Sequence, residues 1–487
     1  MPDVVSLNPD VRTSEDAALP APRPIEKAWA ALPFLIPAIV GLQAKMGATD
    51  LVYHLRAGEQ LLNDLAIPRS DTYTFTAAGV AWVDQQWGAQ AVVRLLYDLG
   101  GWPLLGTAQA LLAGLTFSFV YLACRSSDAS PRASSLLSIG GFVVSSPALS
   151  LRPQLLVLPL FAVILWLLAG RREHPVRLWW IPVAALVTAN MHGSFPLYGL
   201  LVGLAWLDDM RRRDPSARRT LLIGVVSLVA TLANPFGPGI WVYAYELSTN
   251  PVIRDTISEW APITLAHIAG WFMVASGLAI AGYLARRREP VAWSTLVTLG
   301  VFFILAMAAQ RAIVWWGLVA PVALASLLPA KLASATGADR REPALPAIVV
   351  VGSLMALSLM LLPWWRGSTF DRHLDAAPPG LTAAVIEQVE PGSRMMVHQP
   401  WGSWFEFAVP DVPVFVDTRI EIYTEAIWDD YGELGFSGAR WRDVLERWDI
   451  EAIVADEDSW ELIPVLREDS GWRVAYEDDD GVLFLRV

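Results

Sequence analysis

The sequence predicts a polytopic α-helical membrane protein that ends in an α/β domain outside the membrane. Hydrophobic residues make up 54% of its 487 residues and charged residues only 17%, whereas a soluble globular protein carries about 25% charged residues. Apolar runs of about the length that spans a bilayer recur between residues 28 and 363. Residues 370–487 instead carry 26 acidic and 9 basic side chains, and this acidity argues against nucleic acid as a partner.

Residues 1–27 are polar and include Glu15 and Asp16, so they predict a cytoplasmic tail instead of a signal peptide. A membrane domain follows over residues 28–366. Its candidate spans are Ala28–Met46, Trp102–Cys124, Ala133–Leu149, Pro153–Ala169, Arg219–Ala233, Thr264–Ala285, Val291–Met307, Ala312–Leu328 and Leu345–Pro363. The single cysteine, Cys124, excludes an intramolecular disulfide and a cysteine-based zinc site.

Basic residues orient the spans, because cytoplasmic loops are enriched in Lys and Arg. After the basic N-terminal tail, Arg clusters fall at alternate span ends, at 171–172, 211–213, 286–288 and 340–341. This side is therefore predicted to be cytoplasmic, with the protein in the cell membrane. The acidic domain at 370–487 is predicted to be extracytoplasmic.

The segment Leu178–Leu207 lies between two ends that are both predicted to be cytoplasmic, so it needs an even number of crossings. Gly193 and Pro196 interrupt its middle, and both residues break helices. We predict two short helices that meet at a turn below the outer surface, as a hairpin or a re-entrant pair. The total is about eleven crossings, an odd number that agrees with an extracytoplasmic C-terminus.

The first outer loop, residues 47–101, is long and patterned. Apolar residues recur at helical spacing over Asp50–Leu65, and a second amphipathic helix is predicted over Gly88–Leu99. Between them, Thr72–Thr76 has a strand-like pattern, and Asp71 is typical of a turn residue that bonds its own backbone. Two interfacial helices joined by a polar turn suit a site at the surface of the outer leaflet.

The C-terminal domain alternates helix and strand patterns. The predicted helices are Leu381–Val389, Tyr423–Leu434 and Trp441–Trp448, and the predicted strands are Arg394–His398, Val412–Val416, Ile450–Ala455, Trp472–Tyr476 and Val482–Arg486. The domain has no glycine-rich phosphate loop, which argues against a nucleotide site.

Several motifs are spread over most of the chain. They are Thr49–Glu59, Ile67–Thr76, Gly79–Trp87, Leu151–Gln154, Asn190–Gly193, Ala233–Gly237, Ser258–Trp260, Gln310–Arg311, Trp401–Trp404 and Val414–Arg419. As a set they resemble a large bacterial family that is grouped with the GT-C membrane glycosyltransferases, and more distantly the oligosaccharyltransferases and protein mannosyltransferases. The resemblance implies a GT-C-like fold. It also implies transfer of a hexosyl or pentosyl group from a polyprenyl phosphate to a glycan, lipid or protein acceptor outside the membrane.

The same resemblance places an acidic residue directly after the first span, and Asp50 matches that position. A carboxylate there can take the proton of an attacking hydroxyl, or hold a divalent cation, Mg²⁺ or Mn²⁺, against the leaving phosphate. The alternative is that Asp50 caps the following helix, as Thr49 also can. His54 lies one turn later on the same helix face, where it can orient Asp50, bind a phosphate or bond only to backbone.

Four residues are candidates for binding the donor phosphate. Arg152 and Arg311 are single basic residues at outer span ends, where a charge needs a partner. A polyprenyl phosphate is one such partner, and an outer carboxylate is the alternative. His192 and Asn190 lie at the helix break, where a helix beginning near Ser194 would favour an anion, unless the kink is bonded internally.

Asp84, Trp82 and Trp87 are candidates for binding the sugar or the acceptor. Aromatic rings stack on sugars and a carboxylate binds hydroxyl groups, whereas the alternative is a belt of interfacial tryptophans. By resemblance, Glu259 belongs to a mobile loop that closes over the donor and is a further candidate contact.

Trp401 and Trp404 loosely resemble the Trp-rich acceptor motif of oligosaccharyltransferase catalytic subunits, although the Asp of that motif is absent. Their alternative role is to dock the C-terminal domain onto the membrane domain. The sequence therefore favours an inverting glycosyltransferase that uses a lipid-linked sugar. A catalytically silent GT-C-like scaffold that binds lipid is the alternative. A transporter is less favoured, because no internal repeat accompanies the broken helix pair.

Overall fold

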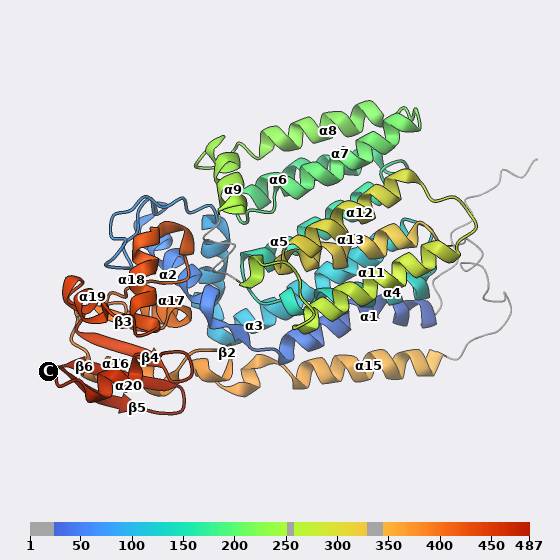
Figure 1. Ribbon diagram of the computed structural model, residues 1–487. Helices are drawn as coiled ribbons and strands as arrows, with labels where there is room; N and C mark the ends of the chain where they lie inside the picture. The colour runs from blue at the N-terminus through green and yellow to red at the C-terminus, as the bar shows by residue number, and fades with distance from the viewer. Residues whose placement is uncertain (1–23, 251–257, 329–343) are drawn as a thin grey trace, which may run out of the picture.

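The computed structural model describes residues 24–250, 258–328 and 344–487, apart from a few side chains that include that of Asp50. Long helices form a bundle, and an α/β unit lies at one end of it (Figure 1). The helices before the C-terminal unit are α1 Pro24–Gln43, α2 Ala48–Asp64, α3 Trp87–Arg125, α4 Pro131–Ser145, α5 Pro153–Ala169, α6 Trp180–Ala189, α7 Pro196–Arg211, α8 Ala217–Ala230, α9 Gly239–Thr249, α11 Ile268–Arg286, α12 Trp293–Ala308, α13 Ile313–Ala325 and α15 Ala344–Met360.

Four of the described helices, α1, α3, α11 and the helix that begins at Ala344, are long and apolar enough to cross a membrane. Shorter apolar helices include α5, which has the predicted bounds, as well as α12 and α13. The chain is therefore a helical membrane protein. The count of about eleven crossings stays a prediction.

The helix α3 contains the predicted boundary between an interfacial helix and a span. Gly101 has φ 60° and ψ −155°, which divides α3 into two parts. A positive φ of this kind is accessible to glycine at little steric cost. The part before Gly101 corresponds to the amphipathic helix predicted over Gly88–Leu99, and the part that starts at Trp102 is the predicted span.

The segment Leu178–Leu207 forms two helices, as predicted, and not one straight helix. The first, α6, ends at Ala189, and α7 begins at Pro196. Both pack against α8. That the pair crosses the membrane twice stays a prediction.

The C-terminal unit contains most of the predicted elements around one small sheet. Its helices are α16 Pro379–Gln388, α17 Gln399–Ala408, α18 Glu425–Gly435, α19 Trp441–Arg447 and α20 Ile463–Glu468, and its strands are β3 Met395–Val397, β4 Ala452–Asp456, β5 Trp472–Glu477 and β6 Gly481–Arg486. The strand order is β3-β4-β6-β5, with β3 and β4 parallel and the other two pairs antiparallel.

Two predicted strands are wrong. Val412–Val416 and Thr72–Thr76 form only isolated bridges, Met395 with Val414 and Thr74 with Val414. Pro413 lacks an N–H group and so interrupts any ladder. In the first outer loop, the Asp71 carboxylate accepts bonds from the backbone N–H groups of Tyr73 and Thr74, as predicted for a turn, and these bonds hold the backbone out of a strand.

The C-terminal unit packs against the first outer loop and the end of the first span. The short strands β1, Met46–Gly47, and β2, Leu374–Asp375, pair in parallel, and α17 packs against α2. Phe407 of α17 also contacts the rings of Tyr97 and Trp102 in α3. These contacts place the beginning of α2, which carries Asp50, between the helix bundle and the C-terminal unit (Figure 1).

Candidate active site at the junction of two cavities

A polar cavity of about 320 Å³ lies where α2, the nearby ends of the membrane helices and the C-terminal unit meet. Five residues that the sequence singles out line it: His54, Arg152, His192, Glu259 and Arg311. They come from the first outer loop, the start of α5, the break between α6 and α7, and the turns before α11 and α13. The structure thus brings together side chains that are far apart in the sequence.

A second cavity, of about 480 Å³, adjoins the polar one and is lined mainly by apolar side chains. Its walls include Leu197 of α7, Leu247 of α9, Leu305 of α12 and Trp315 of α13. Both cavities are lined by Gln86, Gln154, His192, Tyr243, Leu247, Trp260 and Arg311. A charged chamber therefore continues into an apolar groove between helices.

The arginines at this junction are held by neighbours. Arg152 Nη1 lies 2.7 Å from Glu259 Oε2, which is the ion pair with an outer carboxylate that the sequence left open. Burial opposes ionisation of Glu259, but the hydrogen bond from Arg152 and the charges of Arg152 and Arg311 outweigh it and hold the Glu259 pKa below its usual value. The Arg311 guanidinium lies over the Trp260 ring, 4.6 Å from its centroid.

His54 is a neutral group in this cavity. Burial, followed by electrostatic repulsion from His192 and Arg152, lowers the pKa of His54 to about 3. Its Nδ1 has no hydrogen-bond partner within the part of the chain that the structure describes. His192 Nδ1 bonds to Ser194 Oγ at 2.9 Å. A buried neutral imidazole such as His54 can donate or accept one further hydrogen bond.

Asp50 is the third residue of α2, and its side chain lies outside the described residues. The N-cap of α2 is Gly47, so the alternative that Thr49 or Asp50 is the N-cap is wrong. Gly47 takes the extended backbone that an N-cap needs. Thr49, directly before Asp50, lines the polar cavity.

The described side chains supply no ready metal site. Among them, no three His, Cys, Asp or Glu residues form a group that could hold a metal ion. The role of Asp50 as a ligand of Mg²⁺ or Mn²⁺ thus gains no support from its described neighbours, and it stays a prediction.

Four residues that the sequence predicts to contact a ligand line neither cavity: Asn190, Trp87, Trp82 and Asp84. Asn190 accepts a bond from Trp87 Nε1 at 3.1 Å and donates to the Ala233 carbonyl, so the pair joins α3 to the helix break. Trp82 is buried, and its ring centroid lies 4.7 Å from the guanidinium carbon of Arg419. Asp84 is buried and accepts a bond from Gln90, and burial raises the pKa of Asp84 to about 7.

Trp401 and Trp404 also lie away from the two cavities. Both are buried in α17. Trp404 Nε1 donates to Thr382 Oγ1 at 2.8 Å, and its ring packs on Phe370. These contacts lie within the C-terminal unit, and α17 as a whole packs on α2. Both the docking role and the acceptor-binding role of the two tryptophans stay predictions.

Sequence reasoning missed the residues that the C-terminal unit contributes. Thr418 and Glu421 line the polar cavity, and Arg419 is buried beside them. Tyr243 of α9, also unpredicted, lines both cavities. The only signal was that Val414–Arg419 belonged to the set of family-like motifs, which gave no role to any single residue.

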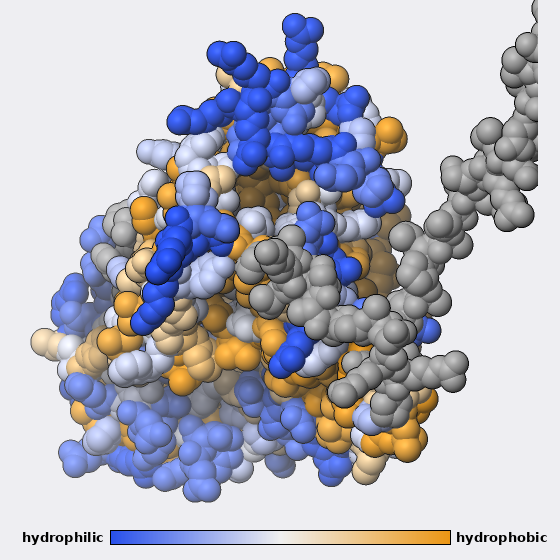
Figure 2. All heavy atoms as spheres, turned by 90° about the vertical axis from the view of Figure 1, so that its right-hand side faces the viewer, coloured by the Kyte–Doolittle hydropathy of each residue, from blue (hydrophilic) through white to orange (hydrophobic). Residues whose placement is uncertain are grey.

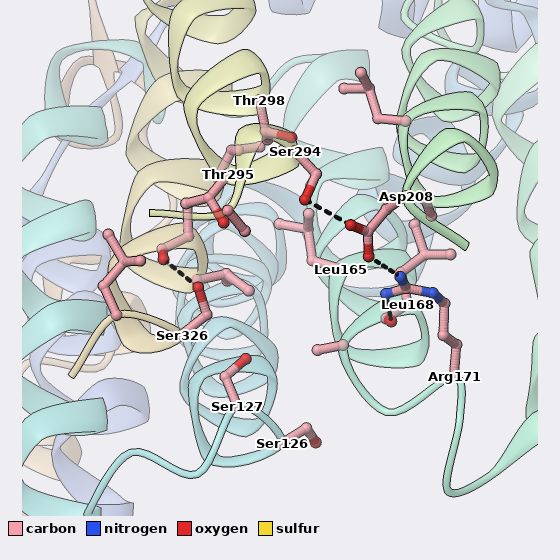
Figure 3. Close-up of a pocket in the computed structure, with 18 of the residues that line it drawn as sticks. Ser126, Ser127, Leu165, Leu168, Arg171, Asp208, Ser294, Thr295, Thr298 and Ser326 are labelled. Atoms are coloured by element: carbon pink, nitrogen blue, oxygen red, sulfur yellow. Dashed lines mark hydrogen bonds and ion pairs between the residues drawn. The ribbon is translucent and has the colours of Figure 1, made fainter. Parts of the chain in front are cut away.

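A further cavity, of about 540 Å³, lies at the other end of the helix bundle. Hydroxyl groups of Ser126, Ser127, Ser294 and Thr295 line it (Figure 3). Asp208 accepts bonds from Arg171 Nη2 at 2.9 Å and from Ser294 Oγ at 2.8 Å. The charges of Asp208 and Arg171 neutralise each other. The two bonds connect α7 to the turn after α5 and to α12, so their role is structural.

Residues of three of the predicted basic clusters gather at this end of the bundle, whereas the cluster at 340–341 lies outside the described residues. Arg171, Arg172, Arg212 and Arg287 all line the same cavity. Figure 2 shows this end of the molecule, where hydrophilic groups gather over one part of the face and apolar surface lies beside them. The arginine-rich end and the α/β unit are therefore at opposite ends of the bundle, as the charge pattern predicts.

No protein-family model matches the sequence, and a search of curated proteins finds no match. Solved structures do match. The Archaeoglobus fulgidus oligosaccharyltransferase, solved with a tethered acceptor peptide that contains the NVT sequon, is 13% identical with a TM-score of 0.54, over 89% of this chain and 69% of that protein. ArnT from Cupriavidus metallidurans bound to undecaprenyl phosphate is 15% identical with a TM-score of 0.50, over 95% of this chain and 97% of ArnT. The arabinofuranosyltransferase AftD from Mycobacteria is 17% identical with a TM-score of 0.58, over 96% of this chain and 40% of AftD.

The chain has the GT-C fold. This confirms the distant resemblance to GT-C glycosyltransferases and oligosaccharyltransferases that the motifs indicate. At such low identity the likeness establishes the fold alone.

Proposed function

We propose that this chain is a glycosyltransferase that moves a sugar from a polyprenyl phosphate to an acceptor on the extracytoplasmic side of the membrane. The observation that carries the proposal is the junction of the two cavities. A chamber with Arg152 and Arg311 continues into an apolar groove between α7, α9, α12 and α13. An amphiphile with an anionic headgroup and a hydrocarbon chain matches both parts.

The arginines supply the charge that a leaving phosphate needs. Arg311 lines both cavities, so it lies where the headgroup and the hydrocarbon chain of such a donor would join. Glu259 holds Arg152 in place through their ion pair. An Arg fork binds phosphate oxygens well, and positive charge aimed at a leaving group stabilises the transition state.

In this proposal Asp50 is the base. An acceptor hydroxyl attacks the anomeric carbon, the bond from that carbon to the phosphate oxygen breaks, and the carboxylate of Asp50 takes the hydroxyl proton. The attack comes from the face opposite the phosphate, so the anomeric configuration inverts. Neutral His54, one turn along α2, supplies one hydrogen bond to the headgroup or to Asp50.

Two solved relatives support the substrate class. ArnT was solved with undecaprenyl phosphate bound, and the Archaeoglobus oligosaccharyltransferase with an acceptor peptide. Both have the GT-C fold of this chain.

Binding of undecaprenyl phosphate tests the donor site. The full chain in lipid nanodiscs should bind it saturably, as measured by native mass spectrometry. Arg311→Gln should weaken the binding about 10- to 100-fold, because a hydrogen bond to a charged group contributes about 1.5–3 kcal/mol. Arg69→Gln is the matched control, since Arg69 is exposed on the first outer loop and lines neither cavity. Equal binding by both variants would contradict the donor site.

Transfer itself tests Asp50. Radiolabelled lipid-linked sugars extracted from bacterial membranes should lose label to an acceptor fraction in the presence of the wild-type chain. Asp50→Asn should reduce this transfer at least 100-fold, since a positioned base contributes about 100- to 10,000-fold, and should leave undecaprenyl phosphate binding within about twofold. A wild-type chain that binds the lipid but transfers nothing would favour the silent scaffold.

A further inference from the structure

The segment 417–422 of the C-terminal unit reaches into the polar cavity. Thr418 and Glu421 line that cavity together with His54, Arg152 and Arg311. The donor site proposed above uses neither of them. Their position gives the C-terminal unit a direct part in the site.

A buried ion cluster fixes this segment to the first outer loop. Arg419 is only 1% exposed. Its Nη2 lies 2.5 Å from Asp71 Oδ1, and its Nε donates to Asp417 Oδ2 at 2.7 Å. The guanidinium also contacts the rings of Tyr73 and Trp82, with its carbon 4.7 Å from each ring centroid. These bonds hold the Arg419 guanidinium in one position, and they hold the segment 417–422 against the first outer loop.

The segment also touches the backbone beside Asp50. Thr418 Oγ1 donates to the carbonyl oxygen of Thr49 at 3.2 Å, and Ser403 Oγ lies 2.7 Å from Thr418 Oγ1. Thr49 directly precedes Asp50. The C-terminal unit therefore fixes the first turn of α2 at the proposed base.

Glu421 lies on this wall as a half-buried carboxylate. The side chain of Tyr243 in α9 is hydrogen-bonded to it, and burial, followed by the charges of Glu421 and Asp84, raises the Tyr243 pKa well above its usual value. Tyr243 thus stays protonated and donates. The carboxylate comes from the C-terminal unit, whereas Arg152 and Arg311 come from the membrane helices.

We propose that the Glu421 carboxylate, oriented by Tyr243, accepts hydrogen bonds from hydroxyl groups of the acceptor. It thereby selects acceptors that carry no negative charge where they meet Glu421. The inference rests on the proposed function and adds the class of acceptor. A carboxylate accepts hydrogen bonds from hydroxyl groups, whereas it repels a carboxylate or phosphate on the acceptor. Neutral, hydroxyl-rich glycans are the class that fits.

Two soluble probes of similar size test this selection. Maltose is neutral and digalacturonate is acidic, and saturation-transfer NMR measures the binding of each. The full chain is held in nanodiscs with saturating undecaprenyl phosphate, so that the donor phosphate occupies Arg152 and Arg311. The wild-type chain should bind maltose at least tenfold more tightly than digalacturonate. Glu421→Gln should reduce this preference at least threefold. Glu425→Gln, an exposed carboxylate four residues along, should leave the preference unchanged.

The same samples separate the two proposals. Undecaprenyl phosphate binding that depends on Arg311 reports the donor site, and the maltose preference reports Glu421. Absence of maltose binding, equal binding of both sugars, or a preference unchanged by Glu421→Gln would each overturn the acceptor inference, even where the lipid binds normally. Loss of lipid binding alone would overturn the proposed function.

Discussion

Replacing Arg419 with Met should weaken the contact between the C-terminal unit and the first outer loop, and so destabilise the protein. Met keeps an unbranched stem of similar length but removes the charge, so Asp71 and Asp417 stay buried without their cation. Breaking a buried ion pair by removing one partner costs about 3–5 kcal/mol. That free energy corresponds to roughly a 150- to 4,000-fold decrease in the equilibrium constant for folding.

The assay is denaturant unfolding of the full chain in detergent, followed by tryptophan fluorescence. Arg440→Met is the control. Arg440 pairs with Glu433 at 2.9 Å, a distance similar to that of the Arg419–Asp71 pair, but the Arg440 side chain is 57% exposed. The control should leave the free energy of unfolding nearly unchanged, because water and salt screen an exposed ion pair.

A double-mutant cycle isolates the Asp71–Arg419 pair. Asp71→Asn removes one of the two carboxylates that Arg419 neutralises. The double variant, Asp71→Asn with Arg419→Met, should therefore lose less free energy of unfolding than the two single variants lose together. The difference should be at least about 1 kcal/mol. The reasoning is refuted if Arg419→Met is as stable as Arg440→Met, or if the two losses simply add.

Three other predictions concern pH, packing and topology. Burial and then the charge of Asp417 raise the pKa of Glu406, a buried residue of α17, well above its usual value of 4.5. Glu406 therefore keeps its proton in the folded protein but loses it on unfolding. The free energy of unfolding should fall as the pH rises above about 4.5, by up to about 1.4 kcal/mol per pH unit, and an equal slope in Glu406→Gln melts would contradict this. A Cβ on Gly58 would lie 2.4 Å from the Gln90 carbonyl oxygen, so Gly58→Ala should destabilise the protein by about 1–3 kcal/mol by forcing α2 away from α3. The control Gly432→Ala places its Cβ in open space and should not destabilise the protein. Similar melting temperatures for both variants would argue against this packing. Alkaline phosphatase fused after Val487 should be active, and activity of a cytoplasm-only reporter at the same point would reverse the topology.

The membrane helices were predictable because hydropathy, helix breakers and charge are local signals. Pro153–Ala169 has the predicted bounds, and the break at 190–195 follows from Gly193 and Pro196. Strand patterns were less reliable. Thr72–Thr76 alternates like a strand, but the Asp71 side chain bonds the backbone there and no neighbouring strand pairs with it beyond one bridge.

Part of the site was predictable for the same reason. Arg152 and Arg311 stood out as lone basic residues at outer span ends, and both line the cavity. Trp82 and Asn190 also looked like ligand contacts, yet their partners are Arg419 and Trp87. Such pairs depend on contacts across hundreds of residues, and one sequence carries no signal of which distant side chain a buried group meets.

The position of the lipid phosphate is the central claim, and a cryo-EM structure of the full chain in nanodiscs with undecaprenyl phosphate tests it most directly. We expect phosphate density between Arg152 and Arg311, with the prenyl chain in the groove beside Leu305 and Trp315. Phosphate density in the cavity at Arg171, at the opposite end of the bundle, with the polar cavity empty would contradict the account.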